Sequence, residues 1–151
     1  MNVLHKAKYF IEDTNPTQKE VSMALLFARI ALGVFFITHG FSKLSGIEGF
    51  TGMLDGLGWP MAALFAWLVT IAEFFGGIAI LLGVFTRFSA FWLAVITIYA
   101  WIGVKGLALG MGDGGGDVDL LALGLTLALF YAGPGALSVS AHMKKGDTQE
   151  K

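Results

Sequence analysis

Long apolar segments, separated by short polar ones, dominate the pattern along the chain. A helix that crosses a membrane needs roughly 20 mostly apolar residues. Four segments are candidates for such helices, at about residues 21–41, 61–82, 87–105 and 117–133. Their apolar runs are too continuous for the alternating pattern of a membrane β-barrel, and the third segment lacks the polar face of a helix in a soluble bundle. The pattern therefore predicts an all-α fold, an integral membrane bundle of four helices.

The fourth segment is short for a full span. Only residues 120–132 are continuously apolar, so we expect this helix to begin earlier, to tilt, or to kink and resume. Gly133-Pro134-Gly135 comes directly after it. Proline cannot continue the hydrogen-bond ladder of a helix, so this tripeptide should end or kink the fourth helix.

Small residues recur four apart within the predicted spans, a spacing that lets helix backbones approach each other closely. This spacing predicts tight packing within the chain or against a partner, without distinguishing the two. The residues concerned are Ala24 and Ala28, Ala72 and Gly76, Ala79 and Gly83, and Gly124 with Ala128 and Ala132.

Two shorter helices are expected outside the spans. Apolar positions in residues 3–11 have helical spacing, which suggests either an interfacial helix on the cytoplasmic membrane surface or an unstructured tail. Ser45-x-x-Glu48 has the form of a capping box, and the apolar positions after it predict an amphipathic helix on the outer surface. Thr17-x-x-Glu20 is a second such box and should open the first span.

Three regions result from this interpretation. Residues 1–15 form an N-terminal amphipathic or interfacial segment, residues 16–141 form the four-helix membrane domain, and residues 142–151 form a charged cytoplasmic tail.

Composition supports a membrane location and excludes several classes of function. The chain is 56% hydrophobic and 14% charged, whereas soluble domains carry about 25% charged residues. A net charge of −1 gives no indication of nucleic-acid binding. The absence of cysteine excludes disulfides, thiolate metal sites and thiol redox chemistry on this chain.

The distribution of lysine and arginine predicts the orientation in the membrane, because cytoplasmic loops carry an excess of these residues. Seven of them lie on the side of the two termini: Lys6, Lys8, Lys19, Arg87, Lys144, Lys145 and Lys151. Only Lys43 and Lys105 lie on the opposite side. We therefore expect a multi-pass protein of the cytoplasmic (inner) membrane with both termini in the cytoplasm.

Two ionisable residues lie deep in the predicted spans, where charges are costly and often functional. Counting from the cytoplasmic ends of their helices puts Arg29 at roughly 12 Å and Glu73 at roughly 15 Å. Because the first two spans are antiparallel neighbours, Arg29 and Glu73 are predicted to form a buried ion pair. Such a pair either holds the helices in register or marks a proton path or an anion or headgroup site.

A second group of polar and aromatic side chains is expected at the outer end of the bundle. A histidine beside a carboxylate could hold a quinone, donating a hydrogen bond to its carbonyl while the carboxylate relays protons. The alternative is an interfacial cluster of salt bridges. The candidate residues are His39, Lys43, Tyr99, Trp101, Lys105, Asp117 and Asp119. No metal site is predicted, since His39 is the only histidine within the spans and no Glu-x-x-His pair occurs.

Four motifs in order resemble those of the DoxX family of small four-helix membrane proteins. They are RIALGVFFITHGFSKLSG (29–46), LGWP (57–60), AEFFGGIAILLGVFTRFSA (72–90) and GGGDVDLLALGLTLALFYAGPGALSV (114–139). Together they cover most of the chain. Asp117 stands where relatives tend to have glutamate.

The resemblance implies a membrane bundle associated with redox complexes, because family members are linked to thiosulfate:quinone oxidoreductase, terminal oxidases and oxidative-stress assemblies. It carries over no catalytic residues. The first hypothesis is a structural or quinone-contacting accessory subunit in the lipid bilayer. Its partners would be other membrane subunits or copies of itself, and its candidate cofactor is quinone. The alternatives are an autonomous quinone-linked oxidoreductase with His39 and Asp117 at the quinone, and a small-solute or lipid transporter built around Arg29 and Glu73.

Overall fold

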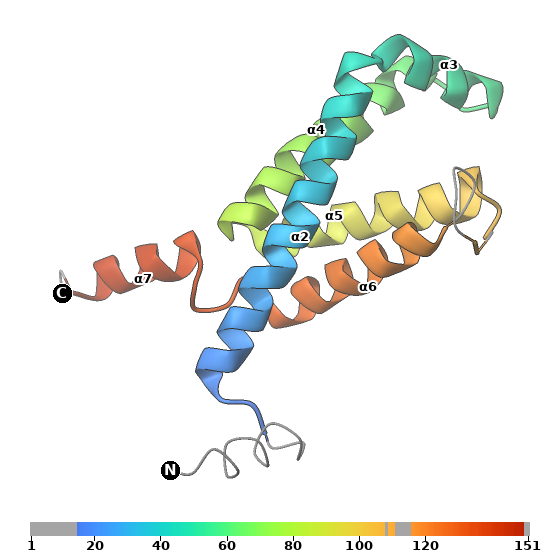
Figure 1. Cartoon of the computed structure of the whole chain (residues 1–151). Helices are drawn as coiled ribbons and strands as arrows, with labels where there is room; N and C mark the ends of the chain where they lie inside the picture. The colour runs from blue at the N-terminus through green and yellow to red at the C-terminus, as the bar shows by residue number, and fades with distance from the viewer. Residues whose placement is uncertain (1–14, 108, 111–115, 150–151) are drawn as a thin grey trace.

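The computed structural model describes residues 15–107, 109–110 and 116–149, and every regular element within these ranges is a helix (Figure 1). The elements are α2 (Gln18–Ser45), α3 (Ile47–Gly56), α4 (Ala62–Leu82), α5 (Thr86–Tyr99), the π-helical turn η1 (Ala100–Val104), α6 (Asp117–Ala132) and α7 (Val139–Gln149). The predicted all-α class is thus confirmed for the part of the chain that is described. The expected interfacial segment at residues 3–11 lies outside it.

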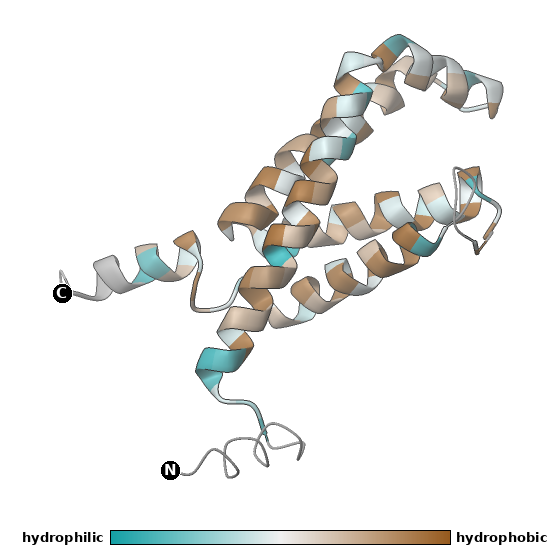
Figure 2. Ribbon diagram, in the orientation of Figure 1, coloured by the Kyte–Doolittle hydropathy of each residue, from teal (hydrophilic) through white to brown (hydrophobic). Residues whose placement is uncertain are grey.

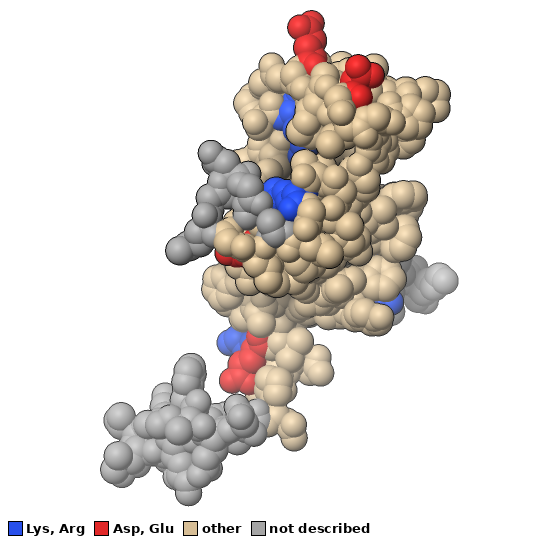
Figure 3. Space-filling model, turned by 90° about the vertical axis from the view of Figure 1, so that its right-hand side faces the viewer, with Lys and Arg blue, Asp and Glu red and all other residues tan. Residues whose placement is uncertain are grey.

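Among the described residues, three helices are long and apolar enough to cross a membrane: α2, α4, and α5 continued by η1 over Thr86–Val104. Hydrophobic residues cover these helices along most of their length (Figure 2). Helix α6 has 16 residues and is therefore about 24 Å long, less than the roughly 30 Å of a bilayer's hydrocarbon core. Charged side chains are sparse on the face seen in Figure 3, where acidic ones project at the α3 end.

Helices α2 and α4 pack along each other as an antiparallel pair, and glycine permits their close approach. A Cβ atom placed on Gly40 would lie 2.5 Å from the backbone nitrogen of Phe74, and one on Gly33 would lie 2.8 Å from the Cβ of Leu81. On the facing helix, a Cβ on Gly77 would lie 2.8 Å from the nitrogen of Ile37. Backbone therefore meets backbone at this interface, which fixes the register of the two helices.

The small residues that make this contact differ from the set expected from four-residue spacing. Gly33 and Gly40 are seven residues apart, two turns of one helix face. Gly124, which belongs to the expected set, has no atom within 4 Å of where its Cβ would be. Spacing alone gives the face of a helix that small residues occupy, and says nothing about whether a second helix lies on that face.

Helices α5 and α6 form a second pair, and α4 lies beside α5 (Figure 1). One buried cluster joins the two pairs, with members from α2, α4, α5 and α6: Leu32, Phe36, Ile80, Ala90, Leu93, Ala122 and Leu129. A second cluster, made by Leu54, Ala62 and Ala66, packs α3 against the start of α4. The predicted outer helix is therefore present and is held against the bundle.

The two predicted capping boxes have different outcomes. At the start of α2 the box is confirmed, since the Glu20 N–H donates to Thr17 Oγ1 at 3.3 Å and the Thr17 N–H donates to Glu20 Oε2 at 2.7 Å. The box expected at Ser45 is wrong. Ser45 is the last residue of α2, its hydroxyl donates to the Phe41 carbonyl at 3.0 Å, and α3 begins without a side-chain cap.

Helix α6 ends at Ala132 and does not resume along the same axis. Gly133 and Gly135 adopt φ values of +79° and +75°, which are easily reached only without a Cβ. The chain turns there and forms α7, which points away from the bundle (Figure 1). Residue 142, where the charged tail was expected to begin, therefore lies within α7.

The α2–α4 contact generates a direct prediction. Gly40→Ala should lower the free energy of unfolding by about 1–3 kcal/mol, because the added methyl group overlaps the backbone of Phe74. Gly124→Ala is the matched control, because no other atom lies within 4 Å of the position of its added Cβ. Thermal unfolding of the purified variants in detergent measures both, and equal stability of the two variants would contradict the close approach.

Candidate functional site

Glu73 and Lys43 form an ion pair within the apolar part of the molecule. Glu73 lies near the middle of α4, and its side chain is 6% exposed. Lys43 lies in the last turn of α2, on the same side of that helix as Gly40, and its ammonium also lies 5.3 Å from the ring centroid of Phe50 in α3. The close contact at Gly40 brings this turn of α2 beside Glu73.

The expected ion pair between Arg29 and Glu73 does not form. Arg29 lies level with Gly83, since a Cβ on Gly83 would be 2.3 Å from Arg29 Nη1. Glu73 is ten residues from Gly83 in the same helix, about 15 Å along the axis. The prediction assumed that α2 and α4 end at one level on the cytoplasmic side, whereas α2 extends about three turns past the end of α4.

Arg29 instead binds the loop between α6 and α7. Its Nη1 donates to the Pro134 carbonyl and its Nη2 to the Leu137 carbonyl, both at 2.7 Å. The residue is 2% exposed, and its Nε has no partner among the described residues. Two carbonyl oxygens at the carboxyl side of α6 thus face a buried guanidinium, an arrangement that stabilises the positive charge without a carboxylate.

Glycine at position 83 is needed for this arrangement. The residue has φ +73° and ends α4, and any side chain there would overlap Arg29. The Ser140 hydroxyl in α7 donates to the Gly83 carbonyl at 2.8 Å. The junction therefore joins α2, the α4–α5 corner and the start of α7.

The outer polar group is divided into separate contacts rather than assembled around one centre. His39 is exposed on α2, where its ring lies 4.0 Å from the Phe35 ring and its Nδ1–H donates to the Phe35 carbonyl at 2.9 Å. Asp117, at the start of α6, accepts from the Gly110 N–H at 2.7 Å. The expected partnership of His39 and Asp117 at a quinone is thus not formed by these side chains.

The remaining residues of that group make contacts close to the ends of the helices. Lys105 donates to Asp119 at 2.6 Å and links the end of η1 to the first turn of α6. The Trp59 indole donates to the Tyr99 hydroxyl, and the two rings meet edge to face at 4.5 Å. Trp101 is half-buried in η1. Within the described residues, no three of His, Cys, Asp and Glu gather closely enough to hold a metal ion.

Two features of the site were missed by reasoning from the sequence. The partner of Glu73 is Lys43, which the sequence had placed in the outer group, and the partners of Arg29 are backbone carbonyls. Gly40, one turn before Lys43, is the signal that could have found the first, because it sets which turns of α2 and α4 face each other. Backbone acceptors leave no signal in the side-chain pattern.

The sequence of the chain is similar to those of known membrane proteins. The DoxX family model matches residues 24–106, more than half of the chain. The chain belongs to the DoxX family. It is 33% identical over 129 residues to the "Inner membrane protein YqjF" of Escherichia coli, covering 85% of this chain and 98% of that protein. The predicted resemblance is thereby confirmed.

Two further relatives have similar coverage. The "Inner membrane protein YphA" of E. coli is 34% identical over 125 residues, which is 76% of this chain and 86% of that protein. The protein named "Putative oxidoreductase CatD" of Bacillus subtilis is 32% identical over 111 residues, 74% of this chain and 81% of that protein. No solved structure matches the chain. The DoxX chain described here is accordingly a membrane protein with relatives named as inner membrane proteins.

The buried arginine gives the first prediction about the site. Arg29→Gln should lower the free energy of unfolding by about 3 kcal/mol, because hydrogen bonds from a charged donor are worth about 1.5–3 kcal/mol each and the substitution removes two. It should also expose residues 133–138 to proteinase K. The control is Arg87→Gln, which removes a single exposed bond of 3.1 Å to the Tyr131 carbonyl. Unchanged cleavage of the loop in Arg29→Gln would contradict the contact.

The ion pair gives the second prediction. Lys43→Met should destabilise the protein by about 3–5 kcal/mol, because it leaves the buried Glu73 carboxylate without its partner. Glu73→Gln should cost less, because the Lys43 side chain that remains is 24% exposed. The exchange Lys43→Glu with Glu73→Lys should recover most of that loss. Thermal unfolding in detergent of wild type, the two single variants, their combination Lys43→Met with Glu73→Gln, and the exchange measures the coupling, with exposed Glu48→Gln as the control. Additive effects would mean that the two residues do not interact.

Proposed function

We propose that this DoxX protein is a membrane subunit of a respiratory or sulfur-oxidising redox complex that uses quinone, and that it contacts the quinone while other subunits carry the electrons. A relative of comparable length is named as an oxidoreductase. The chain has no cysteine, so it supplies no thiol for electron transfer. These two facts support an accessory role in redox chemistry over an independent one.

The observation that carries the proposal is the Lys43–Glu73 pair. Reduction of a quinone to a quinol takes up two electrons and two protons, so a quinone site inside a membrane needs a group that exchanges protons there. Glu73 is a buried carboxylate near the middle of α4, beside a cation. Carboxylates at such depth are rare and commonly serve as proton relays. The pair would therefore deliver protons while the electrons come from elsewhere in the complex.

The proposed arrangement has four membrane crossings with both termini in the cytoplasm. Helix α6 would be the fourth, with a tilt or local thinning of the bilayer to accommodate its 16 residues. The excess of lysine and arginine on the side of the termini supports this orientation. The start of α7 is joined to the α4–α5 corner, so it lies at the end of the bundle opposite α3 (Figure 1).

Purification from native membranes in mild detergent tests the complex. Mass spectrometry should identify redox subunits that come with the wild-type chain in fixed proportion. Recovery of the chain with lipid alone would contradict the complex. Reduction of added quinone by the chain without any other subunit would instead make it an autonomous oxidoreductase.

The exchange Lys43→Glu with Glu73→Lys separates a proton-delivery role from a structural one. It keeps the ion pair but moves the carboxylate from α4 to α2. Quinone-dependent turnover of the complex should fall tenfold or more even though the protein remains stable, because proton transfer depends on the position of the carboxylate. If the exchanged pair restores turnover as well as stability, Glu73 acts only in packing. Glu48→Gln should leave turnover unchanged.

A further inference from the structure

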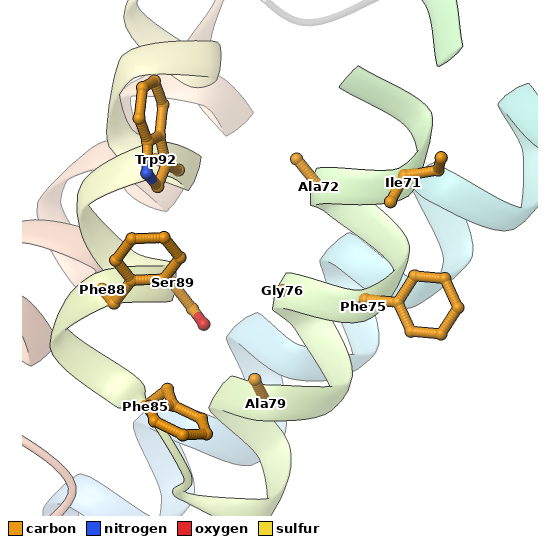
Figure 4. Close-up of a pocket in the computed structure, with 9 residues that line it drawn as sticks. All are labelled: Ile71, Ala72, Phe75, Gly76, Ala79, Phe85, Phe88, Ser89 and Trp92. Carbon is orange, nitrogen blue, oxygen red and sulfur yellow. The ribbon is translucent and has the colours of Figure 1, made fainter. Parts of the chain in front are cut away.

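An apolar groove runs between α4 and α5 on the outside of the helix bundle (Figure 4). Its volume is about 570 Å³, within the range of small-molecule sites. Ala72, Gly76 and Ala79 line it on α4 and leave the helix surface flat (Figure 4). The other side is lined by Phe85, just before α5, and by Phe88 and Trp92 of α5.

One hydroxyl points into the groove. Ser89 is 7% exposed, and its side chain is directed toward α4 (Figure 4). The buried hydroxyls of Thr70 and Thr97 each donate to the carbonyl four residues earlier, at 2.7 Å. The Ser89 hydroxyl forms no such bond with any described residue. The hydroxyl is therefore available to donate to an acceptor that occupies the groove.

The size of the groove decides between a small molecule and a helix as its occupant. Along α4 it extends from Ile71 to Ala79, about 12 Å. Its volume then corresponds to a cross-section of about 50 Å². An α-helix with side chains is about 10–12 Å wide and needs about 80–110 Å². The groove thus encloses a flat ring or a hydrocarbon chain, whereas a helix would lie on its open side.

The charge of the lining decides between a phospholipid and a neutral molecule. No residue that lines the groove is charged. The cation next to it in sequence, Arg87, is directed at α6, where it donates to the Tyr131 carbonyl and lies beside Gly133. A phosphate headgroup would find no partner here. The favoured occupant is a neutral, flat molecule with an oxygen acceptor.

We propose that this groove binds the ring of a membrane quinone, with the Ser89 hydroxyl donating to one quinone carbonyl and the aromatic side chains of α5 against the ring. The isoprenoid tail leaves sideways into the bilayer, where the groove is open. The proposal rests on the proposed function in taking quinone as the carrier, and it places the ring between α4 and α5 in place of the outer group around His39. Ile71 and Ala72, at one end of the groove, are the two residues just before Glu73 in α4.

The test uses the full chain in phosphatidylcholine nanodiscs, titrated with decylubiquinone. Trp92 lines the groove, so a quinone bound there should quench its fluorescence in a saturable manner, and Trp92→Phe should remove that component. Ser89→Ala should weaken binding about three- to tenfold, the loss of one hydrogen bond. Ala79→Phe should abolish saturable quenching by filling the groove, whereas Ala128→Phe, an exposed position on α6, should not.

Three results would overturn the proposal. One is the absence of saturable quenching in the wild-type chain. Another is equal affinity in wild type, Ser89→Ala and Ala79→Phe. The third is a change from dimer to monomer in Ala79→Phe, which would assign the groove to a second copy of the chain. None of these results changes the outcome of the purification experiment, because a chain can belong to a redox complex without binding quinone in this groove. Conversely, a chain that binds quinone here but purifies alone contradicts only the complex.

Discussion

The backbone contact between α2 and α4 determines which other groups of the bundle can meet. Because Gly33, Gly40 and Gly77 bring two helix backbones together, the helices can neither slide nor rotate without a clash. Register in turn decides which charges meet at membrane depth. It places Lys43 beside Glu73 and leaves Arg29 about 15 Å from that carboxylate. A shift of one turn would separate the ion pair and leave two costly charges in an apolar environment.

The two deep charges are stabilised in different ways, which suits different tasks. Glu73 is paired with the Lys43 side chain, which can move and can exchange protons. Arg29 is held by two backbone carbonyls, which are fixed in place and cannot lose a proton. The first arrangement is compatible with proton transfer, and the second serves to connect helices. Chemistry at membrane depth is therefore expected on the α4 side of the bundle, where the groove against α5 also lies.

Much of the fold could be predicted from the sequence, and less of the site. Hydropathy alone located α2, α4, α5 and α6 to within a few residues, because lipid requires long apolar runs with all backbone bonds internal. The polar residues of the spans were identified as candidates for the same reason. Their partners were not, because pairing depends on register, and register depends on which glycines face a second helix. Gly40 does, and Gly124 does not. No pattern of side chains could have predicted that the Pro134 and Leu137 carbonyls accept from Arg29, because they belong to the backbone.

The guanidinium of Arg29 has consequences for how the chain is made. Its two acceptors lie 105 and 108 residues later in the sequence, so they are synthesised long after α2. Until then, the first helix carries a cation in the membrane without the oxygens that stabilise it. A chain that ends before residue 134 therefore lacks both acceptors, and only the segment after α6 supplies them. The arginine thus makes the stability of α2 in a membrane depend on the segment that follows α6.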